Sequence, residues 1–173
     1  ATLRARQHTR VFRQLGWDGR SEDMWGILDA MEKTCTHNKV VIYGPAGCGR
    51  TDLAAQTLLW MIDRCKVTAT VCGCCDSQAD LAHRVTSLES LYDIFGALLS
   101  LGMAARKQND LRKGVLLRTL RSSRAVLWLD DWQCLEEKEQ NKIAQLLSEF
   151  PPTVRVIITL RGSEESRGVR GLR

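Results

Sequence analysis

One stretch of eight residues has the types and spacing needed to hold a phosphate group. It fits the pattern G-x-x-x-x-G-K-[ST] at every specified position except Arg50, which stands in place of the lysine. The stretch reads Gly44, Pro45, Ala46, Gly47, Cys48, Gly49, Arg50 and Thr51. Its three glycines let backbone N–H groups turn toward phosphate oxygens with no Cβ in the way. We therefore predict a phosphate-binding loop between an apolar strand and an amphipathic helix.

The helix expected to start at Arg50 adds chemistry to this loop. Its N-terminus directs the positive end of the helix dipole toward a bound phosphate. The hydroxyl of Thr51 is a candidate magnesium ligand, and Asp52 is grouped with the residues that bind the nucleotide.

A second group of polar residues ends the apolar run 125–129. Acids are rare at the end of a buried strand unless they are solvated or bound to a cation, so Asp130 is a candidate Mg²⁺ ligand acting through water. Asp131 is then placed to polarise an attacking water as a general base. A solvated Asp-Asp turn remains the alternative.

A third group, Thr159-Leu160-Arg161, ends another apolar run. An arginine at this position could reach the γ-phosphate and report its presence, which gives Arg161 a candidate catalytic role. The alternative is a solvent-facing side chain in a basic tail.

Hydrophobic spacing predicts the elements that carry these groups. Helices are expected over about 21–34, 50–65, 78–85, 88–101, 108–122 and 136–149, and strands over 39–43, 67–72, 125–129 and 154–159. Strands separated by helices indicate βαβ units, hence an α/β fold of three layers with a mostly parallel sheet flanked by helices. Ligands of such sheets bind at the carboxyl ends of the strands, where the three polar groups converge.

Charge and cysteine content narrow the possible functions. The net charge is +5, but residues 1–20 and 155–173 carry 10 basic against 3 acidic residues, which leaves 15 basic and 17 acidic in the body. A nucleic-acid groove on the body is therefore not supported. Seven cysteines, an odd number, favour a reducing compartment. The cluster 72–75 lacks a second ligand pair for zinc and is interpreted as small apolar residues at a strand end.

Length and composition predict one domain with two loose ends. We expect a basic lead-in over 1–15, a nucleotide-binding domain over 16–161 and a flexible basic tail over 162–173. No apolar run reaches the length of a membrane span, so no membrane partner is expected.

Taken together, these segments resemble the NB-ARC branch of the STAND signalling NTPases, which includes the animal apoptosome scaffold and plant disease-resistance proteins. The likeness covers about residues 16–161. Gly19 and Arg20 resemble the Gly-Arg element that precedes the P-loop and lies near the adenine. Residues 125–132 resemble the family's apolar strand ending in Asp-Asp-hydrophobic, and 157–161 resemble its sensor strand.

The resemblance implies a function and a set of partners. It implies ATP or ADP as ligand together with Mg²⁺, and a switch in which exchange of ADP for ATP opens the protein for oligomerisation. It also implies helical and winged-helix modules in the same full-length chain, a cytoplasmic location, and a role in signal transduction such as apoptosis or innate immunity.

Two departures from the family bear on that cycle. Arg50 keeps a positive charge but is longer and differently hydrated than a lysine ammonium, so we expect weakened nucleotide binding and, at most, weak ATPase activity. The sequence also stops soon after the sensor strand, before the fifth strand of the family, so we expect the first strand to have an unpaired edge. The alternatives are a conventional P-loop ATPase of AAA type, with fast turnover, and a degenerate pseudo-NTPase that serves as an interaction scaffold.

Overall fold

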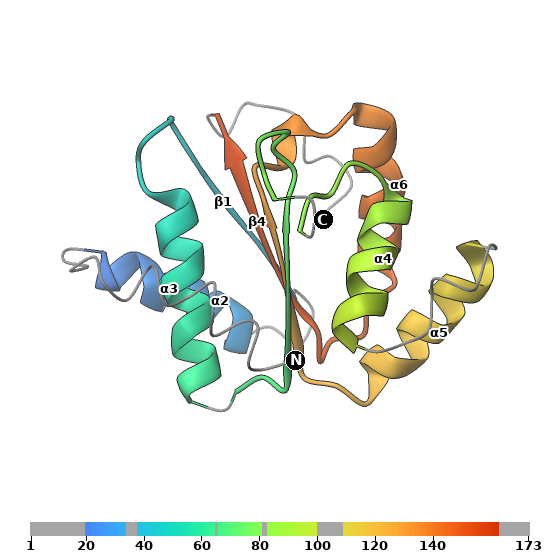
Figure 1. Ribbon diagram of the computed structural model, residues 1–173. Helices are drawn as coiled ribbons and strands as arrows, with labels where there is room; N and C mark the ends of the chain where they lie inside the picture. The colour runs from blue at the N-terminus through green and yellow to red at the C-terminus, as the bar shows by residue number, and fades with distance from the viewer. Residues whose placement is uncertain (1–19, 34–37, 65, 81–82, 100–108, 163–173) are drawn as a thin grey trace.

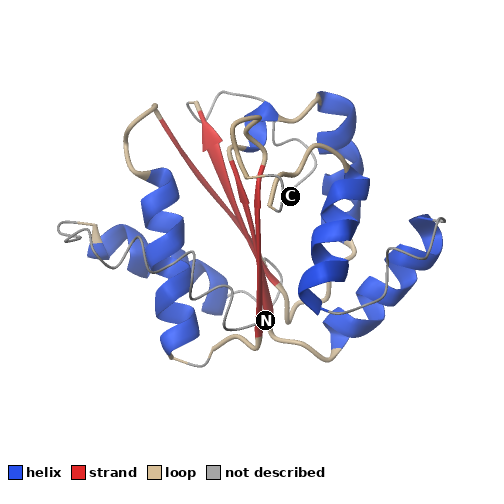
Figure 2. Ribbon diagram, in the orientation of Figure 1, coloured by secondary structure: helices blue, strands red, loops and turns tan. Residues whose placement is uncertain are grey.

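The chain folds into a parallel sheet covered by helices on both faces (Figures 1 and 2). A computed structural model describes residues 20–33, 38–64, 66–80, 83–99 and 109–162. The strands are β1 (Lys39–Gly44), β2 (Ala69–Cys74), β3 (Ala125–Asp130) and β4 (Arg155–Arg161). They lie in the order β1-β4-β3-β2, and each neighbouring pair is parallel. The predicted α/β fold of three layers is confirmed.

Helices cover the two faces of the sheet unequally. α2 (Ser21–Lys33) and α3 (Arg50–Asp63) lie on one side, and α4 (Leu88–Leu99), α5 (Asn109–Arg121) and α6 (Glu137–Ser148) lie on the other (Figure 1). A short 3-10 turn, η2 (Trp132–Cys134), follows β3. Each face has its own hydrophobic cluster, and Val156, Ile157 and Ile158 of the central β4 are completely buried between them. The sheet is thus held rigidly from both sides, which fixes the position of its carboxyl edge.

The strand order places the phosphate-loop strand at the margin of the sheet. Within the described residues, β1 pairs with β4 alone, and its Tyr43 is 48% exposed. The expected unpaired edge is present in this part of the chain. Because β1 and β4 are in register from Lys39 opposite Val156 to Gly44 opposite Arg161, the phosphate loop leaves the sheet beside the end of β4.

Two predicted elements are corrected by the structure. β2 covers Ala69–Cys74, two residues later than the predicted 67–72. Its pairing with β3 begins at Ala69, and the Thr68 N–H donates to the Arg124 carbonyl just before the paired residues. No helix forms in the described part of 78–85. Instead, the Cys74 N–H donates to the His83 carbonyl and the Val85 N–H donates to the Cys74 carbonyl, each at 2.8 Å.

The reason lies in Gly73 and Val85. Val85 is fully buried, and a Cβ on Gly73 would lie only 2.5 Å from the Val85 Cγ2 atom. A glycine inside a strand allows this close approach of the two segments. The segment that follows β2 therefore gains more by bridging to the strand end than by coiling into a short polar helix.

Candidate functional site

The loop between β1 and α3 has the backbone that its glycines require. Gly47 and Gly49 adopt positive φ angles of 76° and 78°, where a side chain would be strained. A Cβ on Gly44 would lie 2.7 Å from the Cys48 Sγ atom. Gly49 caps α3, and its carbonyl accepts the Leu53 N–H at 2.9 Å. The loop thus sits on the N-terminus of α3 at the carboxyl edge of the sheet, and Pro45, Ala46 and Gly47 are exposed at its tip.

The side chain of Arg50 folds back into this loop. Its Nη1 donates to the carbonyl oxygens of Gly44 and Pro45, and its Nη2 lies 3.9 Å from the Asp131 Oδ1 atom. Only 7% of the residue is exposed, yet its Nε has no hydrogen-bond partner within the described residues. A buried N–H donor without an acceptor is costly. The donor set therefore fits an anion such as a phosphate oxygen.

A second guanidinium supports the loop from outside. Arg20, directly before α2, donates from Nη1 to the Cys48 carbonyl at 2.5 Å and from Nε to the Asp23 carboxylate at 2.8 Å. The structure thus places Arg20 on the phosphate loop. Gly19 lies outside the described residues, and a contact of this pair with an adenine stays a prediction.

Thr51 and Asp130 meet across the site although 79 positions separate them. The Thr51 Oγ1 atom lies 3.1 Å from each carboxylate oxygen of Asp130, and the fully buried Thr159 hydroxyl also donates to Oδ1. Burial raises the pKa of Asp130, an effect opposed by the two threonine hydrogen bonds. A carboxylate beside a hydroxyl in a partly desolvated site is a donor set that suits Mg²⁺, which prefers oxygen ligands.

Asp131 is held in an unusual backbone conformation. It is the only described residue other than glycine with a positive φ, 52° with ψ 48°, and it links β3 to the buried Trp132. Its N–H donates to the Thr159 Oγ1 atom at 2.9 Å, and its Oδ1 accepts from the Gln133 Nε2 atom at 2.9 Å. Such conformations cluster at functional sites because the surrounding structure must enforce them.

Comparison with known families decides what kind of site this is. A family model described as "NB-ARC domain" matches residues 20–170. The chain belongs to the NB-ARC family. Together with the fold, this membership makes the chain a nucleotide-binding P-loop module. A comparison with curated proteins finds no match.

Two solved structures share the fold of this NB-ARC domain. One is Cdc6p from Pyrobaculum aerophilum, with a TM-score of 0.64, 13% identity, and coverage of 88% of this chain and 43% of that one. The other is domain III of the replication initiation protein DnaA from Thermotoga maritima, with a TM-score of 0.52, 15% identity, and coverage of 94% and 62%. The chain thus spans less than two thirds of either structure, and at these identities the likeness concerns the fold.

The structure brings most of the predicted site residues of the NB-ARC domain to one edge. The loop from Gly44 to Thr51 lies beside Asp130 and Asp131. The Arg161 side chain is exposed, and its N–H donates to the Gln133 Oε1 atom at 2.8 Å. Asp52 follows Thr51 in the first turn of α3. Its Oδ2 atom would lie 3.9 Å from a Cβ atom added to Gly49. The roles assigned to these side chains stay predictions.

Three residues of the site had no role assigned to them from the sequence. The side chain of Thr159 joins Asp130 to Asp131, and Gln133 joins Asp131 to Arg161. A hydroxyl inside the apolar run 156–160 was the available signal for Thr159, because a buried hydroxyl needs a partner. For Gln133 no signal existed, since its contacts depend on the turn after β3.

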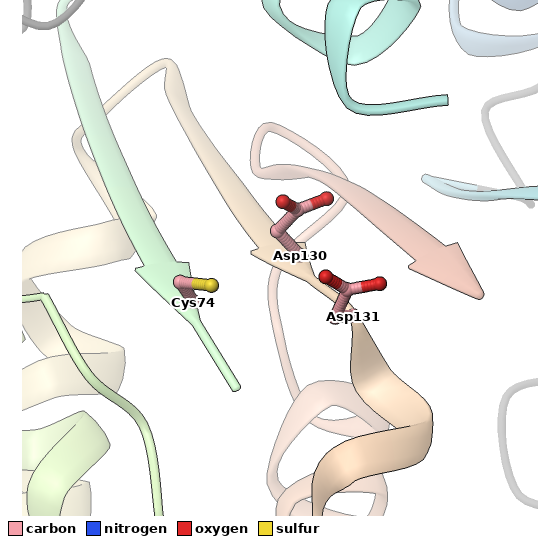
Figure 3. Close-up of side chains that lie close together, drawn as sticks. All are labelled: Cys74, Asp130 and Asp131. Carbon is pink, nitrogen blue, oxygen red and sulfur yellow. The ribbon is translucent and has the colours of Figure 1, made fainter. Parts of the chain in front are cut away.

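Cys74 is the third of these residues, and the interpretation as a small buried apolar residue does not fit it. Its Sγ and the carboxylates of Asp130 and Asp131 offer ligand atoms within 4.8 Å of one another (Figure 3). Cys75 is buried, as expected for a small apolar residue, but Cys74 is only half-buried and faces the two acids. Burial raises the pKa of the Cys74 thiol, and the nearby carboxylates raise it further. The thiol is therefore a neutral neighbour of the site at neutral pH.

Within the described residues, no helix has the length and hydropathy needed to cross a bilayer.

Proposed function

We propose that this NB-ARC domain binds ADP and ATP with Mg²⁺ and acts as a nucleotide-dependent switch for self-association, with slow or absent hydrolysis. One observation carries the proposal. The hydroxyl that follows the phosphate loop lies 3.1 Å from both oxygens of a buried carboxylate on a neighbouring strand. This pairing supports a metal–phosphate site at the edge formed by β1, β3 and β4.

Each part of the site has a separate task in this proposal. The exposed loop and the N-terminus of α3 bind phosphate oxygens through backbone amides. Thr51 and Asp130 hold Mg²⁺, which neutralises phosphate charge when it is bound. Arg161, one strand away from Asp130 and opposite Gly44 in the sheet, is the candidate contact for the terminal phosphate.

Slow hydrolysis follows from the surroundings of Asp131. Its Oδ1 accepts a hydrogen bond from the Gln133 amide and faces the Arg50 guanidinium at 3.9 Å. A general base must be free to accept a proton from water at hydrogen-bond distance. Because the Gln133 amide already occupies this oxygen, and Arg50 stands in place of the usual lysine, we expect slow turnover.

The remaining features of the proposal concern the full-length protein. We assign the nucleotide-binding unit to residues 16–161 and expect helical and winged-helix modules to complete the switch. Free thiols at Cys48, Cys72, Cys74, Cys75 and Cys134 are compatible with the proposed cytoplasmic location. Signalling in apoptosis or innate immunity belongs to the same proposal.

Calorimetric titration with ADP and with ATP in the presence of Mg²⁺ tests the proposal, followed by a phosphate-release assay. We expect binding of both nucleotides with little or no release. Fast release would favour the conventional ATPase, and no binding of either nucleotide would favour the scaffold.

An arginine-to-lysine exchange sharpens this test. Arg50→Lys is expected to tighten nucleotide binding about tenfold, since a lysine ammonium fits the standard loop. Arg155→Lys, at the opposite end of β4, is the matched control and should leave the affinity unchanged. Equal affinity of Arg50→Lys and the parent chain would mean that residue 50 does not touch phosphate.

A further inference from the structure

The guanidinium of Arg50 contacts both sides of the site at once. On one side Nη1 donates to two carbonyls of the phosphate loop, and on the other Nη2 faces the Asp131 carboxylate at 3.9 Å. Both side chains are shielded from water, with 8% and 20% of their surface exposed. An ion pair in such a position is screened much less than one on the surface.

We propose that Arg50 holds the phosphate loop and Asp131 together until a phosphate group enters and replaces Asp131 as the partner of the guanidinium. We call this contact of Arg50 with the loop and with Asp131 the latch. The inference rests on the proposed function and adds its regulation. In the free domain Arg50 holds Asp131. In the bound domain the guanidinium turns its donors to phosphate oxygens, and Asp131 is released.

The donors of Arg50 explain why an exchange of partners is favourable. Arginine carries five N–H donors in a fixed fork. Nη1 uses its donors on the Gly44 and Pro45 carbonyls, while Nε is buried without a partner within the described residues. A phosphate has enough acceptor oxygens for Nε and Nη2 together, so its entry satisfies the orphaned donor and replaces the long contact to Asp131.

A lysine at the same position would present its donors differently. Its ammonium is a single nitrogen at the end of the chain, whereas the fork of arginine presents two terminal nitrogens that face different partners. The loop carbonyls of Gly44 and Pro45 lie on one side of Arg50 and Asp131 lies on the other. In this chain the two terminal nitrogens of Arg50 are what let one side chain reach both partners.

Double-mutant cycles on the free domain test whether the two residues are coupled. The variants are Arg50→Lys, Asp131→Asn and the double variant, each unfolded in urea without nucleotide. We expect the effects to be non-additive by at least about fivefold in the unfolding equilibrium constant, in the range for contacting groups. The control cycle pairs Arg155→Lys with Asp131→Asn, which lie at opposite ends of the sheet and should be additive.

The same variants are then titrated with ADP and Mg²⁺. If the latch opposes phosphate entry, Asp131→Asn tightens ADP binding at least about fivefold more in the parent chain than in the Arg50→Lys background. An equal effect in both backgrounds would show that only the general charge of Asp131 acts on the phosphate, and would overturn the latch. Additivity in the urea cycle would overturn it as well.

Failure of the latch and failure of the proposed function give different results. If the urea cycle shows coupling but no variant binds ADP, the contact between Arg50 and Asp131 is supported. Nucleotide is then rejected as the ligand that breaks this contact. If a variant does not fold, an NMR measurement on the parent chain still tests the latch. The NMR signal of the Arg50 Nε–H should move on addition of ADP or inorganic phosphate, because its orphaned donor gains an acceptor, and an unchanged signal at saturation contradicts the latch.

Discussion

Replacing Thr159 by valine tests a residue of the site to which the sequence assigned no separate role. Thr159 is fully buried in β4, where its hydroxyl donates to the Asp130 carboxylate and accepts the Asp131 N–H at 2.9 Å. Valine has nearly the same shape but no hydroxyl, so the core stays packed while both hydrogen bonds are lost. The variant therefore isolates the polar contribution of this residue.

The size of the effect follows from the two groups left behind. Loss of a hydrogen bond to a buried charged group costs roughly 1.5–3 kcal/mol, and an unpaired, partly buried amide adds about 1 kcal/mol. We thus expect Thr159→Val to lower the free energy of unfolding by about 3 kcal/mol at neutral pH. Thr51, the other hydroxyl donor to Asp130, keeps the loss from being larger.

The assay is urea unfolding at several pH values. The hydrogen bond from Thr159 lowers the pKa of Asp130, so its removal lets the folded variant take up a proton at a higher pH than the parent chain does. The loss of stability should be largest where Asp130 is ionised and should shrink as the pH falls and the carboxyl is protonated in both proteins.

Thr57→Val is the matched control for this experiment. Thr57 is also fully buried, but its hydroxyl only donates to the Leu53 carbonyl one turn earlier in α3. No charge is involved, so the loss should stay at or below about 1 kcal/mol and should not depend on pH. A Thr159→Val effect no larger than that of Thr57→Val, or one that is constant with pH, would refute the role given to this hydroxyl.

Two further predictions concern the loop and the buried acid. Gly49→Ala, at a φ of 78°, should destabilise the domain by about 1–2 kcal/mol and weaken ADP binding in calorimetry. Gly114→Ala is the control: Gly114 lies inside α5 with open space where a Cβ would be added, so the variant should be more stable by about 0.5–1 kcal/mol. Equal effects of the two substitutions would contradict the loop geometry. Burial raises the pKa of Asp130 above its unfolded value, so its contribution to stability is greatest at low pH and is lost as the pH rises through the folded pKa. Asp130→Asn should therefore raise the free energy of unfolding of the free domain by about 1 kcal/mol at neutral pH, as measured in urea, and this increase should vanish in acid. The same variant should weaken Mg²⁺-dependent nucleotide binding. An increase that is the same at every pH would contradict the prediction.

The phosphate loop and the carboxylate beside it were predictable because local and topological rules agree there. Gly47 and Gly49 are glycines since their backbone is left-handed, and the spacing pattern encodes that requirement. The proximity of Thr51 and Asp130 can be predicted without knowing any side-chain contact. Parallel strands present their carboxyl ends at one edge, so polar residues after two apolar runs must come together there.

The segment after β2 shows where such reasoning fails. Its apolar residues fit a short helix as well as a turn, and the choice depends on Gly73, which lies in another element. β2 itself is flanked by β3 and by this segment, so its limits are set by its neighbours and not by its own alternation. Propensity is a weak guide wherever tertiary contacts of this kind decide.

The contacts of Arg50 were beyond sequence reasoning for a different reason. The sequence shows that an arginine replaces the lysine, but the direction of its guanidinium depends on which acceptors lie within reach. Two of these are carbonyls of the loop itself, and the third is the carboxylate of a residue that directly follows β3, 81 positions later. Only the folded chain shows that the substitution creates a connection as well as a change of binding group.

The charges at the edge of the sheet explain why that connection matters. Two guanidiniums, Arg20 and Arg50, donate to carbonyls of the phosphate loop, while two carboxylates, Asp130 and Asp131, lie beside it. Without a ligand these opposite charges balance one another. Under the proposed function, a phosphate that enters would compete with Asp131 for Arg50 and would be repelled by both acids, so we expect the site to favour phosphate that arrives together with a divalent cation for Asp130. If the latch operates as proposed, the contacts of Asp131 after β3 depend on what occupies the loop after β1.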